Sequence, residues 1–241
     1  MIAALPREVA NLVKGWRREK ERTRNVVIHT SEHAVVAYAG MGAARAELAV
    51  RAALAVGSVD YLISVGWAGA TKSEFSAGSI HHPATVIDAA TQMKYSTITG
   101  TGILVTTSNV ANERQKQNLT ASLNADFVDM EAATVARIAA EQGIAFAAVK
   151  AISDEHNAVL PDMQRFITAD GWVDETAFGL HIALRPWLWP ATLRMAQGAT
   201  LSARNLCAEL QQVLQAYEAH VSTPADATNL ESIENQGEAC R

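Results

Sequence analysis

The chain has 241 residues, 49% hydrophobic and 19% charged, which is enough to bury the core of one α/β domain and excludes an intrinsically disordered protein. Its net charge of −5 argues against a dedicated nucleic-acid binder, whose surface is normally basic. The two cysteines provide neither a disulfide framework nor metal-ligand spacing. No signal peptide and no run of 18 apolar residues is recognisable, so we expect a cytoplasmic protein without a metal or a membrane span.

The first part of the chain alternates short apolar runs with helical patterns. The predicted elements are strands at 2–5, 26–29, 34–39 and 61–65 and helices over 8–20 and 43–56. The charged run 17–24 is interpreted as an exposed helix end and loop. Two strands lead into glycine-rich segments, Gly40-Met41-Gly42 and Gly66-Trp67-Ala68-Gly69-Ala70, which we interpret as turns that bring bare backbone close to a ligand.

The second part continues this alternation. We predict strands at 79–87, 103–106 and 144–152 and helices over 113–123, 132–142, 174–195 and 199–219. Gly143 supplies the stop of the helix that begins after Glu131, since glycine adopts left-handed geometry at the lowest cost. Beyond Val221 the composition becomes polar, so a single catalytic domain over 1–220 and a disordered tail over 221–241 are expected. The fold class is α/β, with a mixed central sheet flanked by helices on both faces.

Three acids stand next to the ends of predicted strands. Glu8 follows the first strand, Glu131 opens a helix, and Asp154 emerges from the last buried strand. Each has an ordinary interpretation, as a first-turn acid stabilised by the helix dipole or as a cap. Ligands of open α/β sheets, however, bind at the carboxyl ends of strands, so three acids there indicate a candidate site.

The segments around these acids resemble the nucleoside phosphorylase-I superfamily. Within it, they are similar to the methylthioadenosine/S-adenosylhomocysteine nucleosidases and the hopanoid-associated nucleoside-cleaving enzymes. The matching segments are Ala4-Leu5-Pro6-Arg7-Glu8-Val9, Ala39-Gly40-Met41-Gly42-Ala43-Ala44-Arg45-Ala46, Gly66-Trp67-Ala68-Gly69, Val128-Asp129-Met130-Glu131-Ala132-Ala133 and Lys150-Ala151-Ile152-Ser153-Asp154. The last two are specific, and together the five span about the first 155 residues in the family's order.

The resemblance implies a division of roles among these residues. Asp154 would be the general acid that protonates N7 of a purine, with Ser153 as an orienting donor. Glu131 would accept hydrogen bonds from the ribose hydroxyls, and Met130 would pack against the sugar. Glu8 would be the base that aligns and deprotonates water.

Other positions depart from the family pattern. Gly66, Trp67, Ala68 and Gly69 would form one wall of the pocket, where Trp67 replaces a small Ser or Thr of the relatives. Val110 stands where nucleosidases usually place a Phe that stacks on the base, which puts the base preference in doubt.

The acceptor of the sugar also stays open. Ser64 stands where phosphate-using relatives have an anion-binding Arg, which favours water as the acceptor. Gly40, Gly42 and Arg45 are an alternative pocket for phosphate or water. No cofactor is expected, with phosphate retained as an alternative co-substrate.

The expected function is hydrolysis of the N-glycosidic bond of a purine nucleoside, with an adenosine derivative substituted at the 5′ carbon as substrate. The candidates are methylthioadenosine, S-adenosylhomocysteine and an adenosyl-lipid. The alternatives are a phosphate-dependent phosphorylase and a non-catalytic nucleoside-binding paralogue.

The resemblance also implies a homo-oligomer. Trp187 and Trp189 lie in a short apolar stretch with Arg185, for which we weigh a weak contact with a membrane surface against a subunit interface or a core cap.

Overall fold

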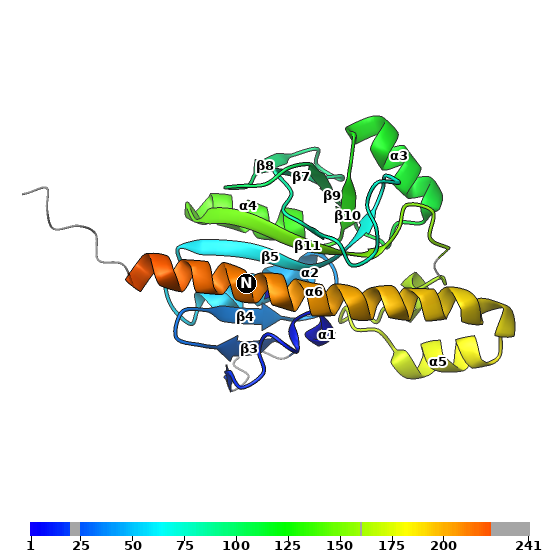
Figure 1. Ribbon diagram of the computed structural model, residues 1–241, viewed down its shortest axis with the longest axis horizontal. Coiled ribbons are helices and arrows are strands. Elements are labelled where there is room, and N and C mark those ends of the chain that lie inside the picture. The colour runs from blue at the N-terminus through cyan, green and yellow to red at the C-terminus, as the bar shows by residue number, and fades with distance from the viewer. Residues whose placement is uncertain (20–24, 160, 223–241) are drawn as a thin grey trace, which may run out of the picture.

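A computed structural model describes residues 1–19, 25–159 and 161–222. These residues form a mixed β-sheet with helices on both faces, which confirms the predicted fold class (Figure 1). The strands are β1 (Ile2–Ala3), β2 (Arg17–Arg18), β3 (Val27–Thr30), β4 (Val35–Tyr38), β5 (Tyr61–Ala70), β6 (Ile80–His81), β7 (Thr85–Asp88), β8 (Lys94–Ser96), β9 (Ile103–Thr106), β10 (Phe127–Asp129) and β11 (Ala145–Asp154). Their order is β2-β3-β4-β1-β5-β10-β9-β7-β8, and β11 pairs with β5 and β6.

The centre of the sheet is the long parallel pair of β5 and β11. β1 is parallel to β4 and β5, so the carboxyl ends of β1, β5 and β11 point toward one edge of the sheet. β10 runs antiparallel to β5, with Val128 opposite Gly69. β10 therefore runs back along the second half of β5. The residues that follow Asp129 thus lie near the carboxyl ends of β1, β5 and β11.

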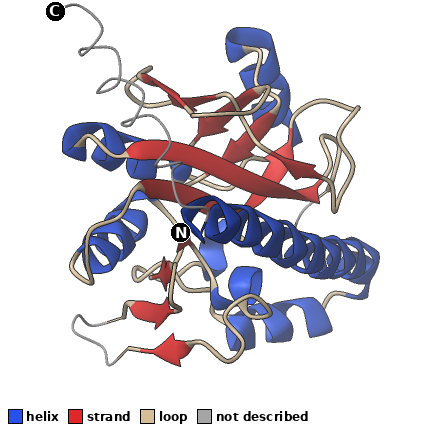
Figure 2. Ribbon diagram, turned by 60° about the vertical axis from the view of Figure 1, so that its left-hand side comes forward, coloured by secondary structure: helices blue, strands red, loops and turns tan. Residues whose placement is uncertain are grey.

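The helices form two layers around the sheet (Figure 2). They are α1 (Pro6–Val9), α2 (Ala43–Leu54), α3 (Glu113–Leu123), α4 (Ala132–Gln142), α5 (Glu175–Ala183) and α6 (Trp189–Ser222), with 3-10 turns η1 (Gln164–Phe166) and η2 (Pro186–Leu188). α2 and α4 share the main apolar core on one face, while α6 packs on β11, β5 and α1 on the other. The predicted helix over 132–142 is confirmed as α4: its apolar side chains, Val135 and Ile138 among them, are buried, and Gly143 ends it at a φ of 66°.

The predicted helix over residues 8–20 is wrong. α1 has four residues, after which the chain turns at Gly15, with a φ of 85° that continues no helix. Arg17 and Arg18 then form the edge strand β2 against β3, and Trp16 packs into the core beside α6. The run 17–24 was expected to be an exposed helix end and loop. Its first two residues form β2 and Glu19 follows that strand, while 20–24 lie outside the described residues.

The predicted glycine turn at 66–70 is also wrong, because β5 continues to Ala70. Pairing with β11 on one side and β10 on the other supplies the hydrogen bonds that keep this glycine-rich segment extended. The predicted strand over 79–87 is two strands, β6 and β7, with Pro83 between them. The hairpin of β3 and β4 and the helix α3 are confirmed.

The C-terminal helices break at a different place from the one predicted. The chain turns between α5 and α6 at η2, where Pro186 starts the 3-10 turn, and Pro190 is tolerated in the first turn of α6. Gly198, near the predicted break, lies inside α6. A Cβ there would lie 2.5 Å from the carbonyl oxygen of Ser153, so glycine lets the helix pass close to β11. Most of the predicted tail, 223–241, lies outside the described residues.

Candidate active site

The three acids identified in the sequence come together in one pocket. Glu8 is carried by α1, directly after β1; Glu131 stands between β10 and α4; and Asp154 is the last residue of β11. The pocket has a volume of about 150 Å³. Its other lining residues are Ala4, Leu5, Met41, Trp67, Ala68, Gly69, Thr107, Asn109, Val110, Ala111, Lys116, Val128, Asp129, Met130 and Ser153.

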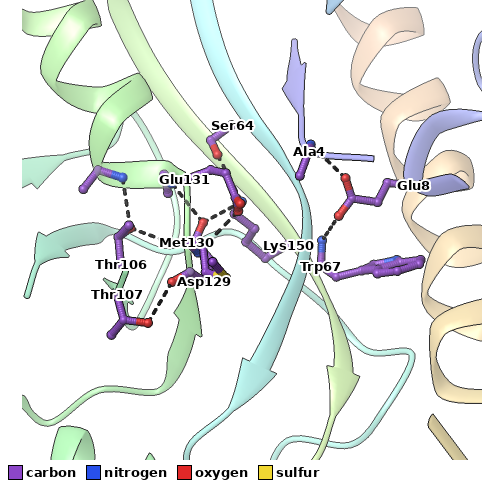
Figure 3. Close-up of polar contacts among 12 residues, drawn as sticks. Ala4, Glu8, Ser64, Trp67, Thr106, Thr107, Asp129, Met130, Glu131 and Lys150 are labelled. Carbon is purple, nitrogen blue, oxygen red and sulfur yellow. Dashed lines mark hydrogen bonds and ion pairs between the residues drawn. The ribbon is translucent and has the colours of Figure 1, made fainter. Parts of the chain in front are cut away.

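Glu8 is buried and held by three backbone donors, two of which, Ala4 and Trp67, are labelled in Figure 3. Its Oε2 accepts hydrogen bonds from the N–H groups of Ala4 and Leu5 at 2.9 and 2.8 Å, and Oε1 accepts one from Trp67 at 3.0 Å. Oε1 therefore keeps a lone-pair position for a further donor, while Oε2 is occupied. Burial raises the pKa of Glu8, and these backbone hydrogen bonds and the charge of Lys150 oppose the shift.

Glu131 is the second fixed carboxylate. Its Oε1 accepts a hydrogen bond from the N–H of Gly42 at 2.7 Å, and Oε2 lies 3.3 Å from the N–H of Met130. Burial raises the pKa of Glu131 to about 7, and the neighbouring Asp129 carboxylate acts in the same direction. This carboxyl group therefore changes charge close to neutral pH.

Beneath Glu131 lies a buried ion pair that sequence reasoning missed. Lys150 Nζ is 2.9 Å from Asp129 Oδ2 and 3.0 Å from Ser64 Oγ, and neither charged side chain is exposed beyond 1%. Asp129 also accepts hydrogen bonds from Thr106 Oγ1 at 2.6 Å and from the N–H of Ala132, the first residue of α4, at 3.0 Å. These bonds orient the turn that carries Glu131. One charge inside the apolar run of β11 was a usable signal, because lysine is almost never fully buried without a partner.

Asp154 has a partner on each oxygen. Ser153 Oγ donates to Oδ1 at 2.6 Å, in the orientation expected from the sequence. Lys116 Nζ, from α3, forms an ion pair with Oδ2 and lies 2.7 Å from the carbonyl oxygen of Glu155. Sequence reasoning missed Lys116, since α3 is polar and nothing in its pattern marks one lysine for burial.

The glycines of β5 allow the strand to approach these acids. A Cβ on Gly66 would lie 2.8 Å from Glu8 Oε1, and one on Gly69 would lie 3.0 Å from Asp154 Oδ2. The Trp67 indole extends away from Glu131 (Figure 3) and packs with the core cluster beside α6, with the Arg7 guanidinium 5.1 Å from its ring centre. Trp67 thus contributes its backbone N–H to Glu8 and one edge of its side chain to the pocket.

Gly40, Gly42 and Arg45 do not line the pocket. The Arg45 guanidinium binds the carbonyl oxygens of Ala39 and Asn25, and its NH1 lies 3.8 Å from Asp170. Gly42 instead contributes its N–H to Glu131. The structure therefore does not assemble the alternative phosphate pocket around Arg45.

Two further regions lie outside this site. Trp187 and Trp189 are 73% and 49% exposed at the turn between α5 and α6. A larger cavity of about 1020 Å³ opens near Met1, Tyr61 and Tyr217, and none of the three acids lines it. In residues 1–19, 25–159 and 161–222, no helix is long and apolar enough to cross a membrane, and no group of three or more His, Cys, Asp or Glu could hold a metal ion.

The family model of the Phosphorylase superfamily matches residues 1–97 and 84–177 of the chain. The chain therefore belongs to the Phosphorylase superfamily, and it is an enzyme of the nucleosidase and nucleoside phosphorylase class, which acts on N-glycosidic bonds. A comparison with curated protein sequences gives no match.

Solved structures share its fold. Futalosine hydrolase of Helicobacter pylori superposes with a TM-score of 0.67 at 15% identity, over 89% of this chain and 96% of that one. Methylthioadenosine nucleosidase of Arabidopsis thaliana gives a TM-score of 0.67 at 17% identity, over 89% and 93%. The 5′-methylthioadenosine/S-adenosyl homocysteine nucleosidase of Helicobacter pylori gives 0.67 at 15%, over 89% and 96%.

Proposed function

We propose that this enzyme hydrolyses the N-glycosidic bond of a purine nucleoside, with a 5′-substituted adenosine as its substrate. The observation that carries the proposal is the convergence of Glu8, Glu131 and Asp154 on one small pocket. A ligand-binding protein needs only groups that hold the nucleoside. A pocket with one acid available to each of the sugar, the base and a water molecule is suited to cleavage.

The sugar binds at Glu131 and Met130. Ionised Glu131 accepts hydrogen bonds from the 2′- and 3′-hydroxyls, and such charge-assisted bonds are about twice as strong as neutral ones. Its negative charge also stabilises the cationic sugar that forms as the bond to the base breaks. Met130, which lines the pocket next to Glu131, packs against the sugar.

The base binds toward Asp154, on the other side of the pocket. Proton transfer from Asp154 to N7 converts a poor leaving group, the purine anion, into a neutral purine, and Ser153 holds the carboxyl group in orientation. Val110 lines the pocket beside Asn109 and offers no aromatic ring to the base. Discrimination between purines then depends more on hydrogen bonds than on stacking.

Glu8 binds the nucleophile. The unoccupied lone pair of Oε1 accepts a hydrogen bond from water, while the three backbone donors keep the carboxylate in place. A raised pKa makes this carboxylate a stronger base toward water once it is ionised.

The pairing of the cations around the pocket favours water over phosphate as the acceptor. Among the described lining residues, Lys116 alone is a cation, and it is engaged by Asp154. Arg45 is directed to backbone carbonyls and Asp170, and Lys150 to Asp129 and Ser64. A phosphate dianion would therefore meet Glu8 and Glu131 without a free cation to balance its charge.

The 5′ substituent extends beyond the pocket. A volume of about 150 Å³ lies below the ~300–1,000 Å³ of ordinary ligand sites, so the pocket has no room for a 5′ group beside the base and the ribose, and such a group extends through the rim. Methylthioadenosine, S-adenosylhomocysteine and an adenosyl-lipid all satisfy this condition. A variant of the Helicobacter pylori nucleosidase, which has the same fold, binds 5′-methylthioadenosine in its active site, and this supports the class.

The test is purine release from methylthioadenosine, S-adenosylhomocysteine, adenosine and inosine, with and without phosphate. We expect phosphate-independent release that falls about 10²–10⁴-fold in Asp154→Asn, the range of general acid catalysis, while nucleoside binding by calorimetry is largely retained. Strict dependence on phosphate would replace hydrolysis by phosphorolysis. Absence of release from all four would contradict the proposed substrates. Homo-oligomeric assembly and a cytoplasmic location stay predictions.

A further inference from the structure

α3 buries one side chain, and that side chain is a lysine. Lys116 has 2% of its side chain exposed, while the rest of α3 is exposed or half-buried. A capping box formed by Asn112 and Gln115 fixes the start of the helix one turn before it. Leu119 and Leu123 of α3 pack, half-buried, on the core, and Lys116 is the one residue that α3 buries fully. Its charge requires a partner, because an unpaired buried ammonium group is very costly.

The partner is the proposed general acid. Lys116 Nζ contacts Asp154 Oδ2 and the carbonyl oxygen of Glu155, and a Cβ on Gly69 would lie 3.0 Å from its Cε. The ammonium group is therefore confined against Asp154. As Ser153 occupies Oδ1, both oxygens of Asp154 accept hydrogen bonds in the resting enzyme. A carboxylate in an ion pair holds no proton that it could give to a purine.

We propose that Lys116 supplies the proton that Asp154 passes to the base; this inference rests on the proposed function. As the bond from C1′ to N9 breaks, its electron pair moves to the purine. N7 then takes a proton from Asp154, and Asp154 takes one from the Lys116 ammonium group. Lys116 becomes a neutral amine, Asp154 is a carboxylate again, and water adds to C1′ while giving its proton to Glu8. Solvent restores the proton on Lys116 and removes the one on Glu8.

A lysine suits this role because the base strength of the purine changes during the reaction. The intact nucleoside is a weak base at N7, whereas the departing purine anion is a strong one. A strongly held proton therefore stays on Lys116 in the ground state and moves only as the bond breaks. Lys116 acts through Asp154, so it is a positioning and proton-supplying residue.

The test is the pH profile of purine release by Lys116→Met and Lys116→Arg. In Lys116→Met, Asp154 must carry the proton itself, so we expect the rate of the variant relative to the wild type to fall by about tenfold per pH unit between pH 6 and 9. The ratio of the two rates cancels the ionisation of Glu131, which both enzymes share. Arginine keeps the charge but does not release a proton, so Lys116→Arg should be as impaired as Lys116→Met at pH 8. A uniform loss at every pH, or recovery with arginine, would overturn the proton supply.

A double-mutant comparison separates this role from general damage. If Lys116 acts through Asp154, then Asp154→Asn and Asp154→Asn/Lys116→Met have equal residual rates, and an additive loss contradicts the proposal. Lys72→Met is the matched control, since Lys72 forms a similar ion pair with Asp126 away from the pocket. Wild-type enzyme inactive on every nucleoside would refute the proposed function itself, whereas an active wild type with an unchanged Lys116→Met profile would refute only the proton supply.

A separate observation concerns the turn between α5 and α6. Five large apolar side chains are exposed there, and we call them the hairpin surface: Leu180, Leu184, Trp187, Trp189 and Leu193. Figure 1 and Figure 2 both show α5 alongside the N-terminal part of α6, beyond the sheet. The indole N–H of Trp189 donates to the carbonyl of Ile182 at 3.0 Å, which links the start of α6 to the end of α5.

The segment that carries the hairpin surface is basic, and the acids near it are Asp174 and Glu175 at the start of α5 and Asp162, whose charge acts on His181. From residue 176 to residue 208 the chain contains no Asp or Glu, but it contains Arg185, Arg194 and Arg204, although the whole chain has a net charge of −5. Exposed Trp and Leu with flanking arginines are the composition of segments that lie in the interface of anionic membranes. A second copy that presents the same basic segment would offer these arginines no opposite charge.

We infer that the hairpin surface binds an anionic lipid surface. In co-sedimentation with vesicles, the wild type should bind phosphatidylcholine with phosphatidylglycerol and bind pure phosphatidylcholine at least tenfold more weakly, and Trp187→Ser/Trp189→Ser should lose binding. Met93→Ser/Ile98→Ser, which alters exposed apolar residues elsewhere, should retain it. Absence of wild-type binding, or a smaller oligomer for the tryptophan variant in sedimentation velocity without a change in lipid binding, would overturn the inference.

Discussion

Glu131 is surrounded by charges of both signs. Burial and the Asp129 carboxylate favour its neutral form, while Lys150 and the N–H of Gly42 favour its ionised form, and the pKa is about 7 as a result. Lys150 does not neutralise this group because its closest contact is with Asp129. The proposed sugar-binding carboxylate is therefore only partly ionised at neutral pH in the free enzyme.

We expect the δ-carboxyl carbon of Glu131 to titrate near pH 7 in 13C NMR, with the resonance identified by its absence in Glu131→Gln. Since the folded state holds this proton more tightly than the unfolded chain, whose pKa is near 4.5, the contribution of Glu131 to the free energy of unfolding should fall as the pH rises from about 4.5 to about 7. Glu131→Gln should remove that part of the pH dependence. Titration of the resonance below pH 5.5 would contradict the assignment.

β5 is the element that Glu8 and Asp154 both approach. Its second half lies between β10 and β11, and its glycines leave room for Glu8 at Gly66 and for Asp154 at Gly69. Gly66 also has a φ of 140°, which side chains rarely adopt. The strand thus leaves space for the two carboxylates, because a side chain at Gly66 or Gly69 would displace one of them.

We therefore expect Gly66→Ala to displace Glu8 from its three backbone donors and to lower purine release by about 10²-fold or more, as for loss of a general base. Gly179→Ala, in the middle of α5 with nothing within 4 Å of the added Cβ, is the matched control and should leave activity unchanged. Circular dichroism checks that both variants fold. A folded Gly66→Ala enzyme of wild-type activity would show that the position of Glu8 is not critical.

In the molecule as a whole, α6 supports the site from the opposite face of the sheet. Ser202 donates to the carbonyl of Ile152, Gly198 lies against Ser153, and the Cys207 thiol lies 3.4 Å from the carbonyl oxygen of Glu8. One helix therefore touches the residues next to Asp154 and the backbone of Glu8. The distance between Glu8 and Asp154 therefore depends on how α6, which is far from both in sequence, packs on the sheet.

Several features followed from local sequence patterns. The alternation of apolar runs predicted the mixed sheet and the hairpin of β3 and β4, and the apolar period with Gly143 predicted α4. Failures arose where long-range contacts outweighed local preference. The helix predicted after Glu8 is short because Arg17 and Arg18 pair with β3. The glycines of β5 are extended because two neighbouring strands pair with them.

By itself, the sequence determined the fold class and the three acids, because apolar periodicity and short motifs are local properties of the chain. Only the tertiary structure decided which charges stand beside those acids. Lys116 and Asp154 are 38 residues apart in the chain. Lys150 of β11 forms its ion pair with Asp129 of β10. Ion pairs of this kind depend on how elements distant in sequence pack, and the cost of burying an unpaired charge then fixes the partners.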